Sequence, residues 1–253
     1  KYPIDQELNA LSQFWIAEFF YKINDFDQAI KNYESFRFSN GALLTKEYRD
    51  LDFHIGYAFF DKSKPYTKIV PSELTKQKKD LNNAIKYLRN YTHQSDIKDS
   101  SMLRNALLRI ADGYFLLKND SLAIENYQKA LTIDSKDQSY ALYQMATSQG
   151  LVQDYQGKMQ TLKRLTKEFP DSKYQVLSLL NLAQSYKDLT MNLEAIDTYL
   201  KFIEEYPNNN FISQAHVEVG SIYLKEGNID ECEKYLLKII NDYPGTLCMS
   251  GFG

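Results

Sequence analysis

The chain has 253 residues, of which 43% are hydrophobic and 25% charged, and its formal net charge is −3. This composition argues against disorder over most of the chain, and the charge balance gives no general attraction for nucleic acid. No apolar run approaches the roughly 18 to 20 residues of a membrane span, so none is expected.

A first helical hairpin is predicted near residues 8–40. Apolar residues recur at helical spacing up to Asn24 and Asp25, which favour a turn and a helix start. A second apolar stripe follows from Ala29. Ala17 and Ala29 stand twelve residues apart, and this separation of two small residues sets the register in which the helices are expected to pack.

The second hairpin is predicted near residues 48–95 and contains an insertion at 61–80. The segment from Lys62 to Asp80 holds two prolines and six lysines. We expect a loop or an extended helix end with local positive charge. Insertions in solenoids often lie on the binding face. The alternative, which we favour, is a tolerated surface insertion, because loop-closure entropy grows slowly with length.

Hairpins three and four are predicted near residues 103–136 and 139–170. The third is regular, whereas the fourth has Gln149, Gly150 and Lys158 where an aromatic residue, a helix former and a small residue are expected. Gly150 and Gly157 are each expected to weaken their helix by roughly 0.5–1 kcal/mol relative to Ala. The array is therefore expected to bend or loosen at this hairpin.

Hairpins five and six, near residues 174–207 and 211–244, repeat one pattern 37 residues apart. The matching residues are Ala183 with Gly220, Tyr186 with Tyr223, Ala195 with Cys232 and Tyr199 with Leu236. A small residue, an aromatic residue, a turn and a second small residue describe two short antiparallel helices. Tyr206 and Pro207 close one repeat, and Tyr2 and Pro3 look alike, which predicts that the natural protein continues upstream.

This pattern resembles the tetratricopeptide repeat. The resemblance implies an all-α, right-handed α-solenoid of about six helical hairpins, which we expect to form one body over residues 1–246, with a non-periodic tail at 247–253. The Pro-containing junctions also resemble tetratricopeptide proteins of the Gram-negative envelope, such as outer-membrane assembly lipoproteins and the Tol-Pal coordinator. That second resemblance implies a periplasmic or outer-membrane location.

Residues able to carry catalysis are few and separated. His54, His93 and His216 fall in different hairpins, and Cys232 and Cys248 match no metal-binding spacing. No HExxH, GxSxG or Gly-rich phosphate motif is present. We therefore expect no enzyme, no cofactor and no metal site, and we expect His216 and Cys232 to be packed between helices.

The tetratricopeptide resemblance implies that the first helices line a concave groove. Positions on either side of each small residue then predict groove residues at Phe14, Glu18, Tyr21, Phe53, Tyr57, Phe60, Leu108, Asp112, Phe115, Tyr140, Tyr143 and Thr147. Exposed aromatic rings in such a groove suit capture of a peptide or a partner helix. The alternative is that tight curvature packs these rings against each other.

Chaperone-binding members of the family clamp a C-terminal carboxylate with Lys, Asn and Arg from three successive first helices. That clamp is absent here, although Asn105 and Arg109 are able to hold a polar group. The sequence thus predicts a non-catalytic scaffold for a peptide or protein partner, within an envelope assembly or secretion complex. A ligand-responsive sensor is the rival interpretation, and end-to-end self-association is expected from exposed terminal repeats.

Overall fold

The computed structural model describes residues 5–64, 71–94, 99–133 and 137–242. The predictions for Tyr2, Pro3, Cys248 and the tail 247–253 lie outside these ranges, as does the middle of the insertion at 65–70. The chain divides into two compact units, residues 1–136 and 137–253, and each is described by itself. A single body over residues 1–246 stays a prediction.

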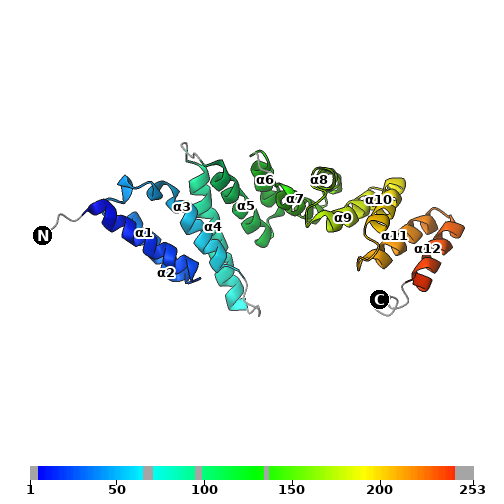
Figure 1. Ribbon diagram of the computed structural model, residues 1–253, viewed down its shortest axis with the longest axis horizontal. Coiled ribbons are helices and arrows are strands. Elements are labelled where there is room, and N and C mark those ends of the chain that lie inside the picture. The colour runs from blue at the N-terminus through cyan, green and yellow to red at the C-terminus, as the bar shows by residue number, and fades with distance from the viewer. Residues whose placement is uncertain (1–4, 65–70, 95–98, 134–136, 243–253) are drawn as a thin grey trace. The chain divides into compact units, whose positions relative to one another are not determined.

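Each unit consists of helices that pack as consecutive pairs (Figure 1). The first unit contains α1 (Gln6–Lys22), α2 (Phe26–Arg37), the short 3-10 helix η1 (Ala42–Leu44), α3 (Glu47–Lys62), α4 (Pro71–Thr92), α5 (Ser100–Leu116) and α6 (Asp120–Leu131). The second contains α7 (Ser139–Leu151), α8 (Tyr155–Glu168), α9 (Gln175–Asp188), α10 (Asn192–Glu205), α11 (Ile212–Lys225) and α12 (Ile229–Asp242). The described ranges hold no strand. The predicted all-α solenoid of helical hairpins is confirmed.

The small residues pack where the two helices of a hairpin approach each other. Ala17 and Ala29 are fully buried, and so are the corresponding pairs Ala111 with Ala123 and Ala183 with Ala195. Small side chains at these points allow close approach of the helices and a dense interior. The twelve-residue register read from the sequence is therefore the packing register of these hairpins.

The turns inside the hairpins share one backbone feature. Asn24, Lys118, Gln153, Thr190 and Gly227 all have positive φ angles, between 58° and 77°. Each stands seven residues after the small residue of its first helix, where a left-handed residue ends the helix and reverses the chain. The hairpin of α3 and α4, which carries the insertion, lacks this residue among the described positions.

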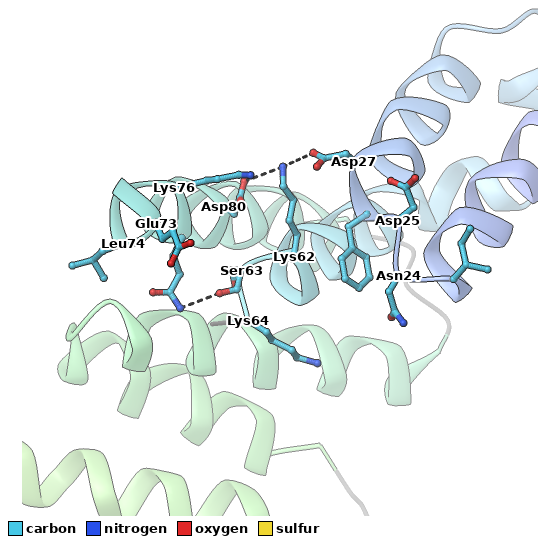
Figure 2. Close-up of a pocket in the computed structure, with 13 residues that line it drawn as sticks. Asn24, Asp25, Asp27, Lys62, Ser63, Lys64, Glu73, Leu74, Lys76 and Asp80 are labelled. Atoms are coloured by element: carbon cyan, nitrogen blue, oxygen red, sulfur yellow. Dashed lines mark hydrogen bonds and ion pairs between the residues drawn. The ribbon is translucent and has the colours of Figure 1, made fainter. Parts of the chain in front are cut away.

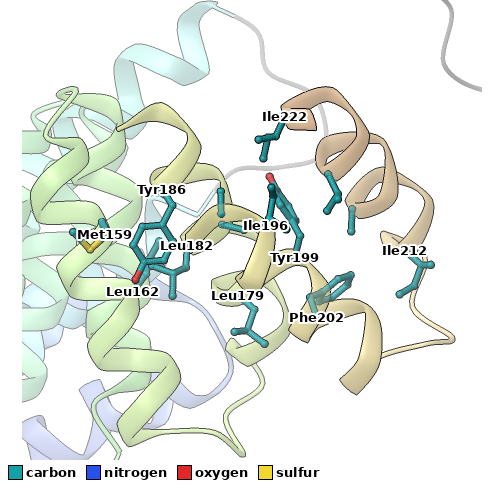
Figure 3. Packing of buried hydrophobic residues seen from close by; sticks show 14 of the residues in the cluster. Met159, Leu162, Leu179, Leu182, Tyr186, Ile196, Tyr199, Phe202, Ile212 and Ile222 are labelled. Atoms are coloured by element: carbon teal, nitrogen blue, oxygen red, sulfur yellow. The ribbon is translucent and has the colours of Figure 1, made fainter. Parts of the chain in front are cut away.

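The core of the second unit shows how aromatic and aliphatic side chains fill the space between hairpins (Figure 3). Tyr199 and Phe202 of α10 lie in one cluster with Leu179 of α9 and Ile212 of α11, and all four are buried. The cluster thus joins successive hairpins, because each helix contributes side chains to both of its neighbours. His216 and Cys232 are also buried, as predicted.

The insertion forms an extended helix end where the structure describes it. Helix α4 begins at Pro71 and runs for 22 residues, so residues 71–80 continue the second helix of this hairpin in its N-terminal direction. Proline is well tolerated in the first turn of a helix, because its missing N–H has no intrahelical partner there. Of the two conformations expected for the insertion, the helical one holds for this part.

The glycines of the fourth hairpin lie at helix ends, which corrects the expected weakening. Gly150 stands in the last turn of α7, and Gly157 stands in the first turn of α8. The Gly157 N–H donates to the capping Asp154 carboxylate at 2.9 Å. Helix propensity penalties apply to helix interiors, so both glycines cost less than the sequence suggested.

Two glycines at small-residue positions predict opposite effects of added volume. A Cβ on Gly56 would lie 2.6 Å from Leu88 Cγ and 3.1 Å from its backbone nitrogen. A Cβ on Gly220 would lie 3.3 Å from the Leu236 side chain, and its nearest backbone atom would be the Cys232 carbonyl oxygen at an ordinary contact distance of 3.6 Å. Gly56→Ala is therefore expected to destabilise by about 1–3 kcal/mol. Gly220→Ala is expected to be neutral or to stabilise by about 0.5–1 kcal/mol. Urea unfolding measures both, and equal shifts would contradict the packing account.

Candidate functional site

The first helices of the first unit form a contiguous surface, because α3 contacts both α1 and α5. Four residues predicted for the groove are instead buried: Phe14, Phe60, Leu108 and Asp112 have relative exposures between 3% and 8%. A helix turns about 100° per residue, so the third residue before and the fourth after a small residue lie only about 60° and 40° from it. Phe14, Phe60 and Leu108 occupy such positions and belong to the core. Asp112 directly follows Ala111, and its carboxylate is buried beside Tyr127 and Arg109.

The other predicted residues of this unit are half-buried. They are Glu18, Tyr21, Phe53, Tyr57, Asn105, Arg109 and Phe115. The rings of Phe53 and Tyr57 lie 4.5 Å apart, and Phe53 also contacts the buried Tyr91 at 5.3 Å. The alternative that the rings pack against each other thus holds in part, since these two rings contact each other and stay only partly exposed.

Glu18 is held by side chains from two other helices. The Tyr33 hydroxyl of α2 donates to its carboxylate, and His54 Nδ1 of α3 lies 2.9 Å from Glu18 Oε1. Burial acts to raise the pKa of Glu18, but the hydrogen bonds with His54 and Tyr33 outweigh it, so this pKa lies below its ordinary value of 4.5. A carboxylate is thereby fixed on the first-helix surface.

This lowered pKa predicts that Glu18 stabilises the first unit in a pH-dependent way. The contribution is present above the unfolded pKa, near 4.5, and is lost as pH falls through the lower folded value. Glu18→Gln is expected to lower stability by about 1 kcal/mol at pH 7 and by less at pH 3, because the contribution of the carboxylate declines as pH falls. Urea midpoints at the two pH values test this, and an equal loss at both would refute it.

Arg109 of α5 lies between the aromatic rings of α3 and a buried carboxylate. Its guanidinium carbon is 5.9 Å from the Tyr57 ring centre and 5.3 Å from that of Phe60. Arg109 Nη1 contacts Asp112 Oδ2 at 2.5 Å, and the Tyr127 hydroxyl donates to Asp112 Oδ1 at 2.7 Å. The arginine is therefore fixed in place over the rings, with its charge close to the surface.

The hydrogen bonds from tyrosine to the first helix recur with one spacing. Tyr33 bonds Glu18, Tyr127 bonds Asp112, and Tyr199 bonds Gln184 at 3.3 Å, each pair fifteen residues apart. In each case the acceptor follows the small residue of the first helix, and the tyrosine stands four residues after that of the second. This network was not predicted, although the pairing of positions is visible in the sequence.

Tyr140 and Tyr143 belong to the second unit, on α7. Both are half-buried, and their rings lie 6.1 Å and 4.9 Å from the ring of Tyr174. Thr147, one turn after Tyr143, donates its hydroxyl to the Tyr143 carbonyl. Tyr140, Tyr143 and Tyr174 thus form an aromatic group within the second unit.

The helical part of the insertion builds a cavity of about 420 Å³ in the first unit. The turn between α1 and α2, the end of α3 and the first turns of α4 line it (Figure 2). The Gln77 amide donates to the Ser63 carbonyl at 2.9 Å and thereby ties α4 to α3. Ile23 and Leu74 supply exposed apolar surface, at 54% and 41%. The insertion therefore adds a hollow as well as charge.

The charges in this cavity are largely paired with each other. Lys62 Nζ lies 2.6 Å from Asp27 Oδ1 and 3.6 Å from Asp80 Oδ1. Burial acts to lower the pKa of Lys62, but the two carboxylates outweigh it and the pKa is raised. Lys64 pairs with Asp61 at 2.7 Å. The positive charge expected from the insertion is thus partly neutralised by the neighbouring hairpin.

Within the described ranges, no three His, Cys, Asp or Glu side chains are grouped so as to hold a metal ion. Among the same residues, no helix combines the length and the apolar character needed to cross a membrane.

Comparison with protein families finds two models, both described as tetratricopeptide repeat. One matches residues 11–37, 140–172 and 177–209, and the other matches residues 105–137 and 213–241. Together they cover more than half of the chain, on five of the six hairpins. A search of curated proteins gives no match.

Solved structures share the fold at low sequence identity. MamA is 17% identical with a TM-score of 0.58 over 79% of this chain and 96% of its own. YrrB, described as a tetratricopeptide protein with an unusual peptide-binding site, is 14% identical with a TM-score of 0.55 over 81% of this chain and 91% of its own. The apo form of RapI is 14% identical with a TM-score of 0.53 over 90% of this chain and 75% of its own.

Proposed function

Because the chain belongs to the tetratricopeptide repeat family, we propose that it is a non-catalytic scaffold that binds a peptide or partner protein. The binding surface in this proposal is the first-helix surface of the first unit, made by α1, α3 and α5. The observation that carries it is the fixed arrangement of Tyr57, Arg109 and Glu18 on that surface. Side chains held in place before binding lose little entropy when a partner arrives.

The chemistry of this surface suits a segment with both apolar and charged groups. Phe53, Tyr57 and Phe115 offer aromatic area, and Arg109 and Glu18 offer opposite charges at separate points. Aromatic and arginine side chains dominate the binding energy of most protein interfaces. The described peptide-binding site of YrrB, a protein of the same fold, supports the proposal.

The cellular setting and the self-association of the protein are also proposals. An envelope assembly or secretion complex rests on the aromatic-Pro junctions at Phe169 and Tyr206, which close α8 and α10. End-to-end self-association is supported by exposed apolar side chains at α1 and α12, where Trp15 is 59% and Ile240 is 52% exposed. A ligand-responsive regulator is the second candidate function, and the cavity built by the insertion favours it.

The test compares two variants in partner capture with full-length protein in its native cell. Tyr57→Ala/Phe115→Ala removes two half-buried rings from the first-helix surface, and Phe38→Ala removes a ring that is 81% exposed elsewhere. We expect the double variant to capture at least about tenfold less of one crosslinked partner than the wild type and Phe38→Ala capture. Circular dichroism confirms folding first. Equal capture by a folded double variant would overturn the proposal.

A further inference from the structure

In the fourth hairpin, two residues that depart from the repeat pattern lie next to each other. Gly150 stands where Tyr21, Phe60 and Phe115 provide rings in the first three hairpins, and Lys158 stands where the other hairpins have Ala or Cys. A Cβ on Gly150 would lie 3.3 Å from Lys158 Cδ and 3.7 Å from Nζ. The lysine stem therefore runs along the space that a ring leaves empty.

Lys158 lines a cavity of about 280 Å³ in the second unit. Tyr143, Thr147 and Gly150 of α7 line it, together with Tyr155 of α8 and Asn181 of α9. Tyr155 is 36% exposed, so the cavity is open to solvent on its side. A cation and polar groups thus converge on a hollow between two hairpins, as in small binding sites.

No carboxylate within the described ranges forms an ion pair with Lys158. The partly buried Lys62 and Lys187 differ, because Lys62 contacts Asp27 and Asp80 and Lys187 contacts Glu218. Burial lowers the pKa of Lys158, against the weaker opposing field of Asp188. A half-buried ammonium without a counter-charge is costly, and an anion in the cavity would remove that cost.

We propose that this cavity binds a carboxylate of a peptide or protein partner, with the Lys158 ammonium as the charged donor. The Asn181 amide already donates one N–H to the Leu177 carbonyl and retains a second N–H for the bound oxygen. Tyr143 and Tyr155 supply ring surface beside it. The site lies in the second unit, so it does not rest on the first-helix surface of the first unit.

The carboxylate has two sources, a C-terminus or an acidic side chain, and three probe peptides distinguish them. Acetyl-Gly-Gly-Tyr carries a free C-terminal carboxylate, acetyl-Gly-Glu-Tyr-amide carries a side-chain carboxylate, and acetyl-Gly-Gln-Tyr-amide carries neither. NMR of the full chain with carbon-13 lysine follows the Lys158 ε-methylene signal during titration. At least one carboxylate peptide is expected to shift this signal and to bind about tenfold more tightly than the Gln peptide.

Three variants distinguish the effect of the Lys158 charge from that of the free volume in the cavity. Lys158→Met keeps the stem and removes the charge, Gly150→Phe keeps the charge and fills the cavity, and Lys163→Met removes an exposed charge on the same helix. The first two are expected to weaken carboxylate binding by about tenfold, and the third to leave it unchanged. Binding of the carboxylate and Gln peptides with equal affinity, or unchanged binding by folded Lys158→Met, would overturn the proposal. Partner capture by the first-helix surface is read out separately.

Discussion

Replacing Phe202 with Ala is expected to lower the free energy of unfolding by about 3–5 kcal/mol. The ring is fully buried in the core that joins α8, α9, α10 and α11, and it stacks on Tyr206 at 5.7 Å. Removing it leaves a cavity between two hairpins, because the helices on either side are held by further contacts and close it only partly. Urea unfolding followed by circular dichroism measures the loss.

Leu193→Ala is the matched control for this loss. Leu193 lies in the same helix and is 73% exposed, so its truncation is expected to change stability by less than about 0.5 kcal/mol. If Phe202→Ala unfolded at the same urea concentration as Leu193→Ala, the contact between hairpins would not hold the second unit together, contrary to the structure.

Asp112→Ala is expected to cost about 2–4 kcal/mol in the first unit. The carboxylate is 6% exposed, it accepts a hydrogen bond from Tyr127, and it contacts Arg109. Its removal takes the acceptor from a buried hydroxyl and the counter-charge from an arginine. The estimate stays below that for a fully buried ion pair, because the Arg109 side chain is 36% exposed and water screens it.

Arg109→Gln separates the two parts of this effect. It keeps Asp112 as the acceptor for Tyr127 and removes the partly exposed ion pair together with the contacts of the guanidinium with two aromatic rings, so a loss of about 1 kcal/mol is expected. Unfolding midpoints of the two single variants and of the double variant complete a double-mutant cycle for the pair. A larger loss for Arg109→Gln than for Asp112→Ala would show that the hydrogen bond from Tyr127 is not the main contribution.

The hairpins and their register were predictable because they depend on local spacing. Ala17 and Ala29 are small enough to fit where the helices approach closely, and their separation fixes the turn between them. The groove was harder to predict. Phe14 and Phe53 occupy the same repeat position, yet Phe14 is buried and Phe53 is half-buried. Phe14 packs against Tyr33 and Phe36 of α2, and these neighbours on another helix cannot be read from the spacing within α1.

Features that join distant residues could not be predicted from local spacing. The contact of Lys62 with Asp27 joins two hairpins, and it neutralises charge that the insertion alone suggested was available. The stem of Lys158 lies in the space beside Gly150, which it faces across the hairpin. Both depend on how helices are placed against each other, whereas the sequence pattern reports one helix at a time.

Site-specific photo-crosslinking tests whether a partner binds through the first helices of the first unit. A photoreactive phenylalanine replaces Phe115 on the first helix α5 in one variant and the exposed Gln128 on the second helix α6 in another. Both are expressed at native level in the cell of origin. The account predicts that one protein partner crosslinks at position 115 and not at 128. Crosslinking of that partner at 128 alone would contradict a scaffold that binds through its first helices.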